Sequence, residues 1–475
     1  MISFTILIEL ECGTMSHHHN LDIVDTNAEV RGNSFVSCLK TNALVIATFA
    51  GVILGAILGI ILRETKEWTV REQEYVGYIG QVFLQMLKSL IVPLIVSSLV
   101  SAIASLDLTL SGKIAARAIA YYLTTTFAAV VLGIVLVVSI KPGEGHSPDF
   151  ATSSDGERKN TTTVNTLLDL IKNMFPPNIV EASIFQYRTK SSNDDTGSEQ
   201  EVVQTTNILG LVVASVSIGI ALAQLGDEAK ALANFFHSLM AVMMKITGWV
   251  ISLSPVGVMF LVAYEVLQMK DIASVMSSLG KYFGTVCLGL LLQGFVVLPL
   301  LYYLLTRRNP VTFIMHIGQA VATAFGTASR SRSKSRTICF AYWCYNKFDG
   351  TALYEAVAAI FIAQVRGVHL DIGTLIAISI TATAASIGAA GIPQAGMVTM
   401  VMVLETVGLD SKDISLILAV DWLLDRCRTA INVMGDSFGA AIVNHRSQKE
   451  LESLEDSLSM NSDDLKTFET EQICQ

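Results

Sequence analysis

Charge is scarce in this chain of 475 residues, because only 15% of them are Asp, Glu, Lys or Arg while 52% are hydrophobic. Soluble domains carry about 25% charged residues, so the composition excludes a soluble enzyme of this length. The net charge of −9 argues against nucleic acid as a partner. With a mean hydropathy of +0.53, the chain is predicted to be a polytopic protein of the lipid bilayer.

Paired cysteines are also lacking, since the seven cysteines form no C-x-x-C pair. Their spacing therefore predicts neither a disulfide framework nor a metal site, and no redox chemistry. The first 40 residues lack the basic n-region of a signal peptide, and Met15 could equally be the start of the chain.

Hydrophobic runs long enough to cross a bilayer are abundant. They cover residues 43–63, 77–106, 113–140, 207–225, 231–264 and 275–306. The polar segment 142–206 contains a glycosylation sequon at Asn160, which predicts an extracellular location, although a single sequon also arises by chance. Counting crossings from this segment places the N-terminus in the cytoplasm, together with Arg307 and Arg308.

The most informative stretch is 415–443, an apolar run that nevertheless carries several charges. On a helix, one arc of about 100° holds six polar residues, whereas Arg426 points elsewhere. The six are Asp421, Asp425, Arg428, Thr429, Asn432 and Asp436. Charges at helix ends can snorkel to the headgroups, but Asp425 and Asp436 lie about 16 Å apart along a helix and cannot both reach one interface. Ionisable groups at such depth are usually functional, so we expect a binding face.

Two interrupted hydrophobic segments follow residue 310. GQAVATAFGTAS precedes DGTALYEAVAAIFIAQV, and ISITATAASIGAAGIPQAG precedes the charged stretch. Such a pair in corresponding positions indicates broken helices around a midplane site, where free carbonyls bind Na⁺ and half-helix N-termini favour carboxylates. The alternative is that the small residues only allow close helix packing.

These motifs, together with LDLIKNMFPPNIVEA, LQMLKSLIVPLIVSSLVSAI and DWLLDRCRTAINVMGDSFGAAIV, resemble the excitatory amino acid transporters of the dicarboxylate/amino acid:cation symporter family. The resemblance implies an all-α polytopic membrane protein with eight transmembrane helices and two re-entrant hairpins, built from inverted repeats as an elevator. It also implies a plasma-membrane homotrimer with both termini cytoplasmic. The implied activity is Na⁺ symport of L-glutamate and L-aspartate with H⁺ symport, K⁺ antiport and a Cl⁻ conductance, without an organic cofactor or a catalytic residue.

The resemblance further implies a division of the chain. Its parts are an N-terminal segment 1–42, scaffold helices at 43–112 and 207–265, a transport-domain helix at 113–141, the extracellular region 142–206, the main transport domain 275–443 and a cytoplasmic tail 444–475.

Site residues carry over from the family motifs in the same way. The residue matching Asp425 receives the substrate ammonium, and the one matching Arg428 pairs with the side-chain carboxylate. Thr429 and Asn432 match positions that hold the amino group or the α-carboxylate. Ile392 and Gly396, in the second hairpin, match further substrate-binding positions.

Three sodium sites are implied. One is formed by Asp436 with Asn432, and a second by Asp349 with Tyr122, Thr125 and Thr126. Carbonyl groups of Ser386, Ile387 and Ala389 would supply the third. Tyr122 taken alone would be an ordinary packing residue.

Glu355 lies inside an apolar helix, where burial favours the protonated form of a carboxyl group. Family members with this glutamate are proton-coupled and return with K⁺, so the resemblance implies that role for Glu355. The alternative is a protonated, hydrogen-bonded carboxyl with no part in transport.

One stretch, 328–348, departs from the family pattern. It places Arg330, Arg332, Lys334 and Arg336 in alternation where a serine-rich hairpin tip is expected, at a cost on the order of 10 kcal/mol in a bilayer. Its sharp borders favour a missing piece plus a shifted reading frame over a regulatory insertion. A transport-dead regulatory subunit or truncated isoform is therefore the alternative function. A remote one is an intramembrane aspartyl protease using Asp421, Asp425 and Asp436.

Overall fold

The computed structural model describes most of the chain between residues 43 and 450. The described residues are 43–105, 108–144, 163–190, 199–269, 272–327, 349–368, 370–388, 396, 399–401, 403–404, 408–409, 411–448 and 450. Several of the sequence predictions lie outside them: Asn160, Ala389, Ile392, the segment 328–348, the N-terminal segment 1–42 and most of the tail 444–475.

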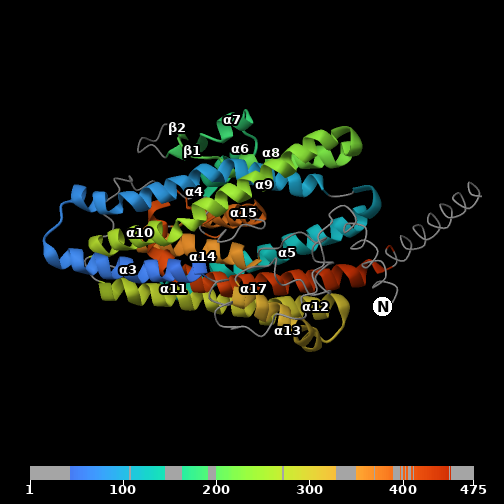
Figure 1. The fold of residues 1–475 in the computed structure, drawn as a ribbon. Helices are drawn as coiled ribbons and strands as arrows, with labels where there is room; N and C mark the ends of the chain where they lie inside the picture. Colours follow the sequence, from blue (N-terminus) through green and yellow to red (C-terminus); the bar gives the residue numbers. More distant parts are fainter. Residues whose placement is uncertain are drawn as a thin grey trace, which may run out of the picture.

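Long helices that run roughly along one direction form the body of the molecule (Figure 1). Within the described residues, five helical stretches are long and apolar enough to cross a membrane. They are Ile46–Thr65, Val70–Ala104, Ala116–Ile140, Ile208–Ser252 and Ala273–Thr306. The first three correspond to α3 (Ala43–Thr65), α4 (Val70–Ala104) and α5 (Leu108–Ile140), as the hydrophobic runs predict.

The hydrophobic run 231–264 predicts a single helix, and this prediction is wrong because the structure has two helices there. Helix α8 (Ile208–Leu225) is followed by a short 3₁₀ turn, η2 (Gly226–Ala229), and then by α9 (Lys230–Ser252). Helix α9 ends before Leu253, and α10 (Ser254–Gln268) begins with Pro255 in its first turn. Proline is tolerated at that position because its missing N–H would be unpaired there in any case. Hydropathy alone does not reveal this break, whereas Pro255 is a sequence signal for the start of a new helix.

The run 275–306 contains a change of helix type in its middle. Helix α11 (Ile272–Leu292) passes into the π-helical turn η3 (Gln293–Val297) and then into α12 (Leu298–Thr306). Such wide turns occur often at functional sites, and this one begins at a polar residue, Gln293. Helix α12 ends at Arg307, whose left-handed φ of 58° closes the helix.

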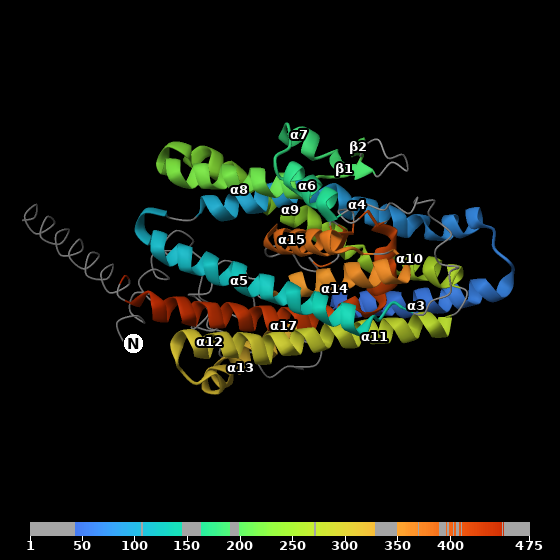
Figure 2. The same ribbon diagram turned by 180° about the vertical axis from the view of Figure 1, so that it is seen from behind.

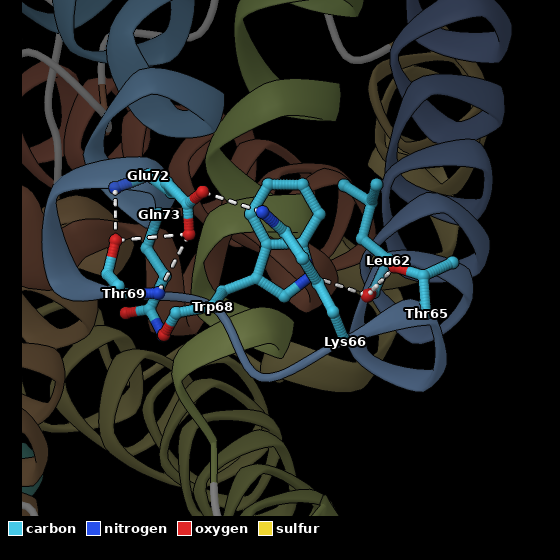
Figure 3. A network of polar contacts seen from close by, with 7 residues as sticks. All are labelled: Leu62, Thr65, Lys66, Trp68, Thr69, Glu72 and Gln73. Atoms are coloured by element: carbon cyan, nitrogen blue, oxygen red, sulfur yellow. Dashed lines mark hydrogen bonds and ion pairs between the residues drawn. The ribbon is translucent and has the colours of Figure 1, made fainter.

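A polar network fixes the corner between α3 and α4 (Figure 3). Thr69 and Glu72 form a capping box at the start of α4. Lys66 lies over the ring of Trp68 and pairs with Glu72 at 2.6 Å, while Trp68 Nε1 donates to the Leu62 carbonyl at 2.6 Å. These contacts explain why four residues suffice to turn the chain between the two long helices.

The polar region after α5 folds into a small subdomain at one edge of the body, above α4 and α15 in both views (Figures 1 and 2). It contains α6 (Thr163–Met174), α7 (Ile179–Ala182) and the antiparallel strands β1 (Gln186–Lys190) and β2 (Glu199–Val203). Opposite charges face each other across the strands at Arg188 and Glu201. The prediction of an all-α fold is therefore wrong for these two strands.

Helix α14 (Asp349–Val365) forms the centre of the fold, and every residue of it except Gln364 is buried. A helix that is apolar on all sides is stable only when other helices surround it. Helices α5, α11, α15 (Ile372–Gly388) and α17 (Ser415–Arg446) pack around it, while α13 (Pro310–Thr327) lies along α17. The two helices that carry most of the predicted site, α14 and α17, are thus held face to face.

Polar contacts fix the start of α17. Ser415 Oγ donates to the buried Glu265 carboxyl group of α10 at 2.5 Å. Arg366, directly after α14, pairs with Asp413 in the short helix η5 (Ser411–Ile414). Glu265 belongs to the predicted scaffold and Ser415 to the predicted transport domain. The bond between Ser415 and Glu265 therefore joins the two parts that the predicted elevator would move relative to each other.

Candidate functional site

The polar face of α17 points into the protein. Asp421, Arg428, Thr429 and Asn432 are buried, and Asp425 is partly exposed. Arg426, which the helical period places on another face, donates instead to the Phe325 carbonyl of α13 at 3.3 Å. The basic last turn, with His445 and Arg446, suits the negative end of the helix dipole.

Arg428 is held on three sides. Its Nη2 pairs with Asp425 Oδ1 one turn earlier on the same helix, and its guanidinium lies 4.7 Å from the centre of the Tyr354 ring. A Cβ added to Gly396 would lie 2.1 Å from Arg428 Nη1, so only glycine leaves room for the guanidinium there. Within the described part of the chain, Nη1 has no hydrogen-bond partner.

A buried guanidinium with an unused donor is costly unless another acceptor completes it. Arg428 is therefore arranged to receive a further anionic group, and the adjacent Asp425 can accept a cationic one. Asp421 adds a second buried carboxyl group beside Arg428 and shares a hydrogen bond with Tyr354. The arrangement matches a ligand that carries both charges.

Asn432 links α17 to the first turn of α14. Its Oδ1 accepts from the Gly350 backbone N–H at 2.8 Å, and its Nδ2 donates to Thr351 Oγ1 at 3.2 Å. A Cβ on Gly350 would lie 3.1 Å from Asn432 Oδ1, so the close approach favours glycine. In this structure the Asn432 amide thus joins two helices, and the neighbouring Thr429 is buried beside it in the same helix.

Asp349 is the centre of a second polar cluster and is fully buried. Its Oδ1 accepts from Thr126 Oγ1 at 2.7 Å and from Thr125 Oγ1 at 3.4 Å, both on α5. The structure therefore brings together three of the four residues expected at the second sodium site. Carboxylate and hydroxyl oxygens are ligands that hard cations prefer.

Gln293 also belongs to this cluster, although sequence reasoning did not find it. Its Nε2 lies 3.3 Å from Asp349 Oδ2 and 3.3 Å from the Thr125 carbonyl. Its Oε1 is buried, with no hydrogen-bond partner among the residues that the structure describes. The signal that could have found it is a lone amide in the apolar run LLLQGFVVLP.

Tyr122 is half-buried, and its backbone carbonyl accepts from Thr125 Oγ1 at 3.1 Å. It is the neighbouring Tyr121 whose hydroxyl reaches α17, where it donates to the Gly435 carbonyl at 3.1 Å. The acceptor, Gly435, directly precedes Asp436, which is half-buried on α17 one turn after Asn432. Tyr121 thus positions the backbone next to the first predicted sodium site.

Ser386 and Ile387 lie in the last turn of α15, which ends at Gly388. The last four carbonyl groups of a helix lack partners within it and carry the negative end of its dipole. The two backbone carbonyls are therefore suited to a cation, as predicted for the third sodium site. The Ser386 hydroxyl is already used, since it donates to the Thr383 carbonyl at 2.8 Å.

Glu355 is fully buried on α14, next to Tyr354. The Thr399 hydroxyl and the Arg428 guanidinium are the polar groups that act on its carboxyl group. Thr399 also donates to the Gly396 carbonyl at 3.4 Å. Glu355, Gly396 and Arg428 are thus neighbours, which places the predicted proton-coupling residue beside the predicted substrate site.

Comparison with known proteins identifies the class to which this site belongs. The chain matches the model of the sodium:dicarboxylate symporter family over residues 44–333 and 345–446, and it belongs to this family. It is therefore a multi-pass membrane protein of a transporter family, which sets aside the protease alternative. The interruption of the match falls inside the segment 328–348, where the sequence departs from the family pattern.

Individual relatives are similar over most of their length. Excitatory amino acid transporter 3 of Mus musculus is 41% identical over 89% of this chain and 89% of its own. Excitatory amino acid transporter 1 of Ambystoma tigrinum is 42% identical over 87% of this chain and 85% of its own. An excitatory amino acid transporter of Caenorhabditis elegans is 41% identical over 88% and 90%.

Proposed function

We propose that this protein is a sodium-driven symporter that carries L-glutamate and L-aspartate across the plasma membrane. The observation that supports this most directly is the buried Arg428 guanidinium, held by Asp425 and Tyr354 with Nη1 unused within the described residues. An acidic amino acid has two carboxylates and one ammonium. Arg428 would pair with the side-chain carboxylate and Asp425 would receive the ammonium, with Thr429, Asn432, Ile392 and Gly396 completing the site.

Sodium would bind at three oxygen-rich places. These are Asp349 with Tyr122, Thr125 and Thr126, Asp436 with Asn432, and the carbonyl groups of Ser386, Ile387 and Ala389. Moving a substrate of charge −1 together with several Na⁺ uses the ion gradient and the membrane potential, which supplies about 2.3 kcal/mol per charge per 100 mV. This coupling would allow the protein to concentrate its substrate.

Glu355 would carry the coupled proton, and its deprotonated form would favour return with K⁺. Its full burial beside Arg428 and Thr399 supports this role. Glu355→Gln is expected to abolish net, K⁺-dependent uptake while sparing exchange of labelled for unlabelled substrate. Unchanged dependence on internal K⁺ would contradict the assignment.

The proposed assembly is a homotrimer with both termini in the cytoplasm. The helices at 43–112 and 207–265 would form a fixed scaffold, while 113–141 and 275–443 move as an elevator and Cl⁻ passes between the two parts. Masses of the detergent-solubilised protein test the trimer. Anion currents in cells expressing the protein test the conductance.

A pair of arginine variants tests the substrate site. Arg428→Leu should abolish Na⁺-dependent uptake of L-aspartate into proteoliposomes, because the carboxylate loses its partner. Arg426→Leu, two residues away but directed at Phe325 of α13, is the matched control and should keep uptake near the wild-type level. Equal losses in the two variants would contradict the assigned role of Arg428.

A transport-dead regulatory subunit is the second candidate, favoured by the interruption of the family match between residues 333 and 345. Such a subunit would bind intact relatives and lower their uptake on co-expression. Uptake by the purified chain alone in proteoliposomes would contradict this alternative.

A further inference from the structure

Two cysteine thiols from different helices meet beside the proposed substrate site. Cys287 of α11 and Cys427 of α17 are both free and partly exposed, and their side chains share a hydrogen bond. Cys427 lies between Arg426 and Arg428 in the sequence. The cysteine spacing gave no sign of this pair, because the two residues approach only through the packing of α11 on α17.

The two helices are locked together close to the thiols. A Cβ added to Gly294, two turns after Cys287, would lie 2.5 Å from Ile431 Cδ1 and 3.0 Å from Met434 Cε. Ile431 itself lies one turn after Cys427. Glycine therefore lets side chains of α17 pack closely on the turn η3 that follows α11. The hydrogen bond between the two thiols places their sulfur atoms next to each other, as the formation of a disulfide requires.

We propose that Cys287 and Cys427 form an oxidisable thiol pair that a hydroperoxide closes into a disulfide between α11 and α17. One thiolate attacks a peroxide oxygen, the O–O bond breaks, and a sulfenic acid forms with release of water. The second thiolate attacks the sulfenic sulfur, the S–S bond forms, and hydroxide leaves and is protonated to water. The pair loses two electrons and two protons, and hydrogen peroxide becomes two molecules of water.

The bridge would act on the segment of α17 that carries Asp425 and Arg428. It ties that segment to α11 and thereby restricts the adjustment by which Arg428 leaves Asp425 for a substrate carboxylate. Oxidation should therefore lower uptake, and reduction should restore it. This consequence rests on the proposed function, whereas formation of the bridge does not.

The first arm of the test is chemical. The full-length protein with serine at Cys12, Cys38, Cys339, Cys344 and Cys474 keeps only the pair. After hydrogen peroxide, mass spectrometry of the digest should find the Cys287 and Cys427 peptides linked, and dithiothreitol should separate them. The bridge should also raise the melting temperature of this protein but not of its Cys287→Ser variant. Absence of the linked peptide would overturn the proposal.

The second arm measures uptake of L-aspartate into proteoliposomes. Peroxide should reduce uptake several-fold in the protein that keeps the pair, with recovery in dithiothreitol, and leave Cys287→Ser unaffected. Equal inhibition of Cys287→Ser, or full uptake by the bridged protein, would overturn the regulatory part. If the untreated protein transports no acidic amino acid, the proposed function fails, while a linked peptide still supports the thiol pair.

Discussion

Replacing Gly396 by alanine is the sharpest perturbation that the site offers. The added Cβ would lie 2.1 Å from Arg428 Nη1 and 2.6 Å from Cζ and Nη2, distances that non-bonded atoms do not adopt. The backbone at Gly396 is buried, so the contact is relieved most easily when the guanidinium moves. Gly396→Ala therefore displaces Arg428 without removing its charge.

The size of the effect follows from the bond that Arg428 would lose with the substrate. A hydrogen bond between a guanidinium and a carboxylate is of a type that contributes about 1.5–3 kcal/mol. A displaced guanidinium forfeits this bond, which corresponds to a loss of roughly 10- to 100-fold in apparent affinity for an acidic amino acid.

The assay is the concentration dependence of Na⁺-driven L-aspartate uptake into proteoliposomes. Gly284→Ala in α11 is the matched control, because nothing lies within 4 Å of its added Cβ. Melting temperatures of both variants show whether each still folds. If Gly396→Ala folds and keeps its apparent affinity within about twofold of the wild type, Arg428 does not act through the position seen here.

Three further predictions concern contacts outside the Arg428 site. Thr126→Ala removes the 2.7 Å hydrogen bond to Asp349 and should raise the Na⁺ concentration for half-maximal uptake about tenfold. The control is Thr124→Ala, which should leave this Na⁺ concentration unchanged because the Thr124 hydroxyl bonds within its own helix. Arg117 donates a hydrogen bond to Glu450 and thereby lowers the pKa of the Glu450 carboxyl group. The contact therefore stabilises the fold at pH values above the ordinary pKa of glutamate, and this stabilisation is lost as the pH falls through the lowered pKa of Glu450. Melting temperatures of wild type and Glu450→Gln should differ at neutral pH and converge in acid; parallel curves would contradict this. Ser415→Ala removes the bond to Glu265 and should speed substrate exchange if the two predicted domains separate, and an unchanged rate would speak against that contact as a restraint.

Local periodicity predicts relations within one helix well. The placement of Asp425 and Arg428 on one face and the different direction of Arg426 both follow from spacing along α17, and the structure has both. The same is true of the first three membrane-crossing helices, whose hydrophobic runs are bounded by polar residues. These features depend on residues close together in the chain.

Contacts between residues of different helices could not be predicted from the periodicity of a single helix. Gln293, at the start of a π-helical turn, contacts Asp349 of another helix, and Tyr121, which was not among the predicted site residues, reaches α17. The spacing of the cysteines excludes a C-x-x-C motif, but it cannot exclude that Cys287 of α11 and Cys427 of α17 come into contact in the folded protein. The break at Leu253 was missed because hydropathy stays high on both sides, although Pro255 marks the start of the second helix.

The pairing of Arg428 with Asp425 has a consequence for the empty protein. A lone guanidinium carried through the apolar part of a bilayer would bring a large desolvation penalty, whereas a neutral internal pair brings much less. In the proposed cycle, Asp425 would take the place of the substrate carboxylate when no substrate is bound. The carrier without substrate thus supplies the counter-ion of Arg428 from its own chain. A substrate would bind by replacing Asp425 as the partner of Arg428, and the site would stay close to electrically neutral.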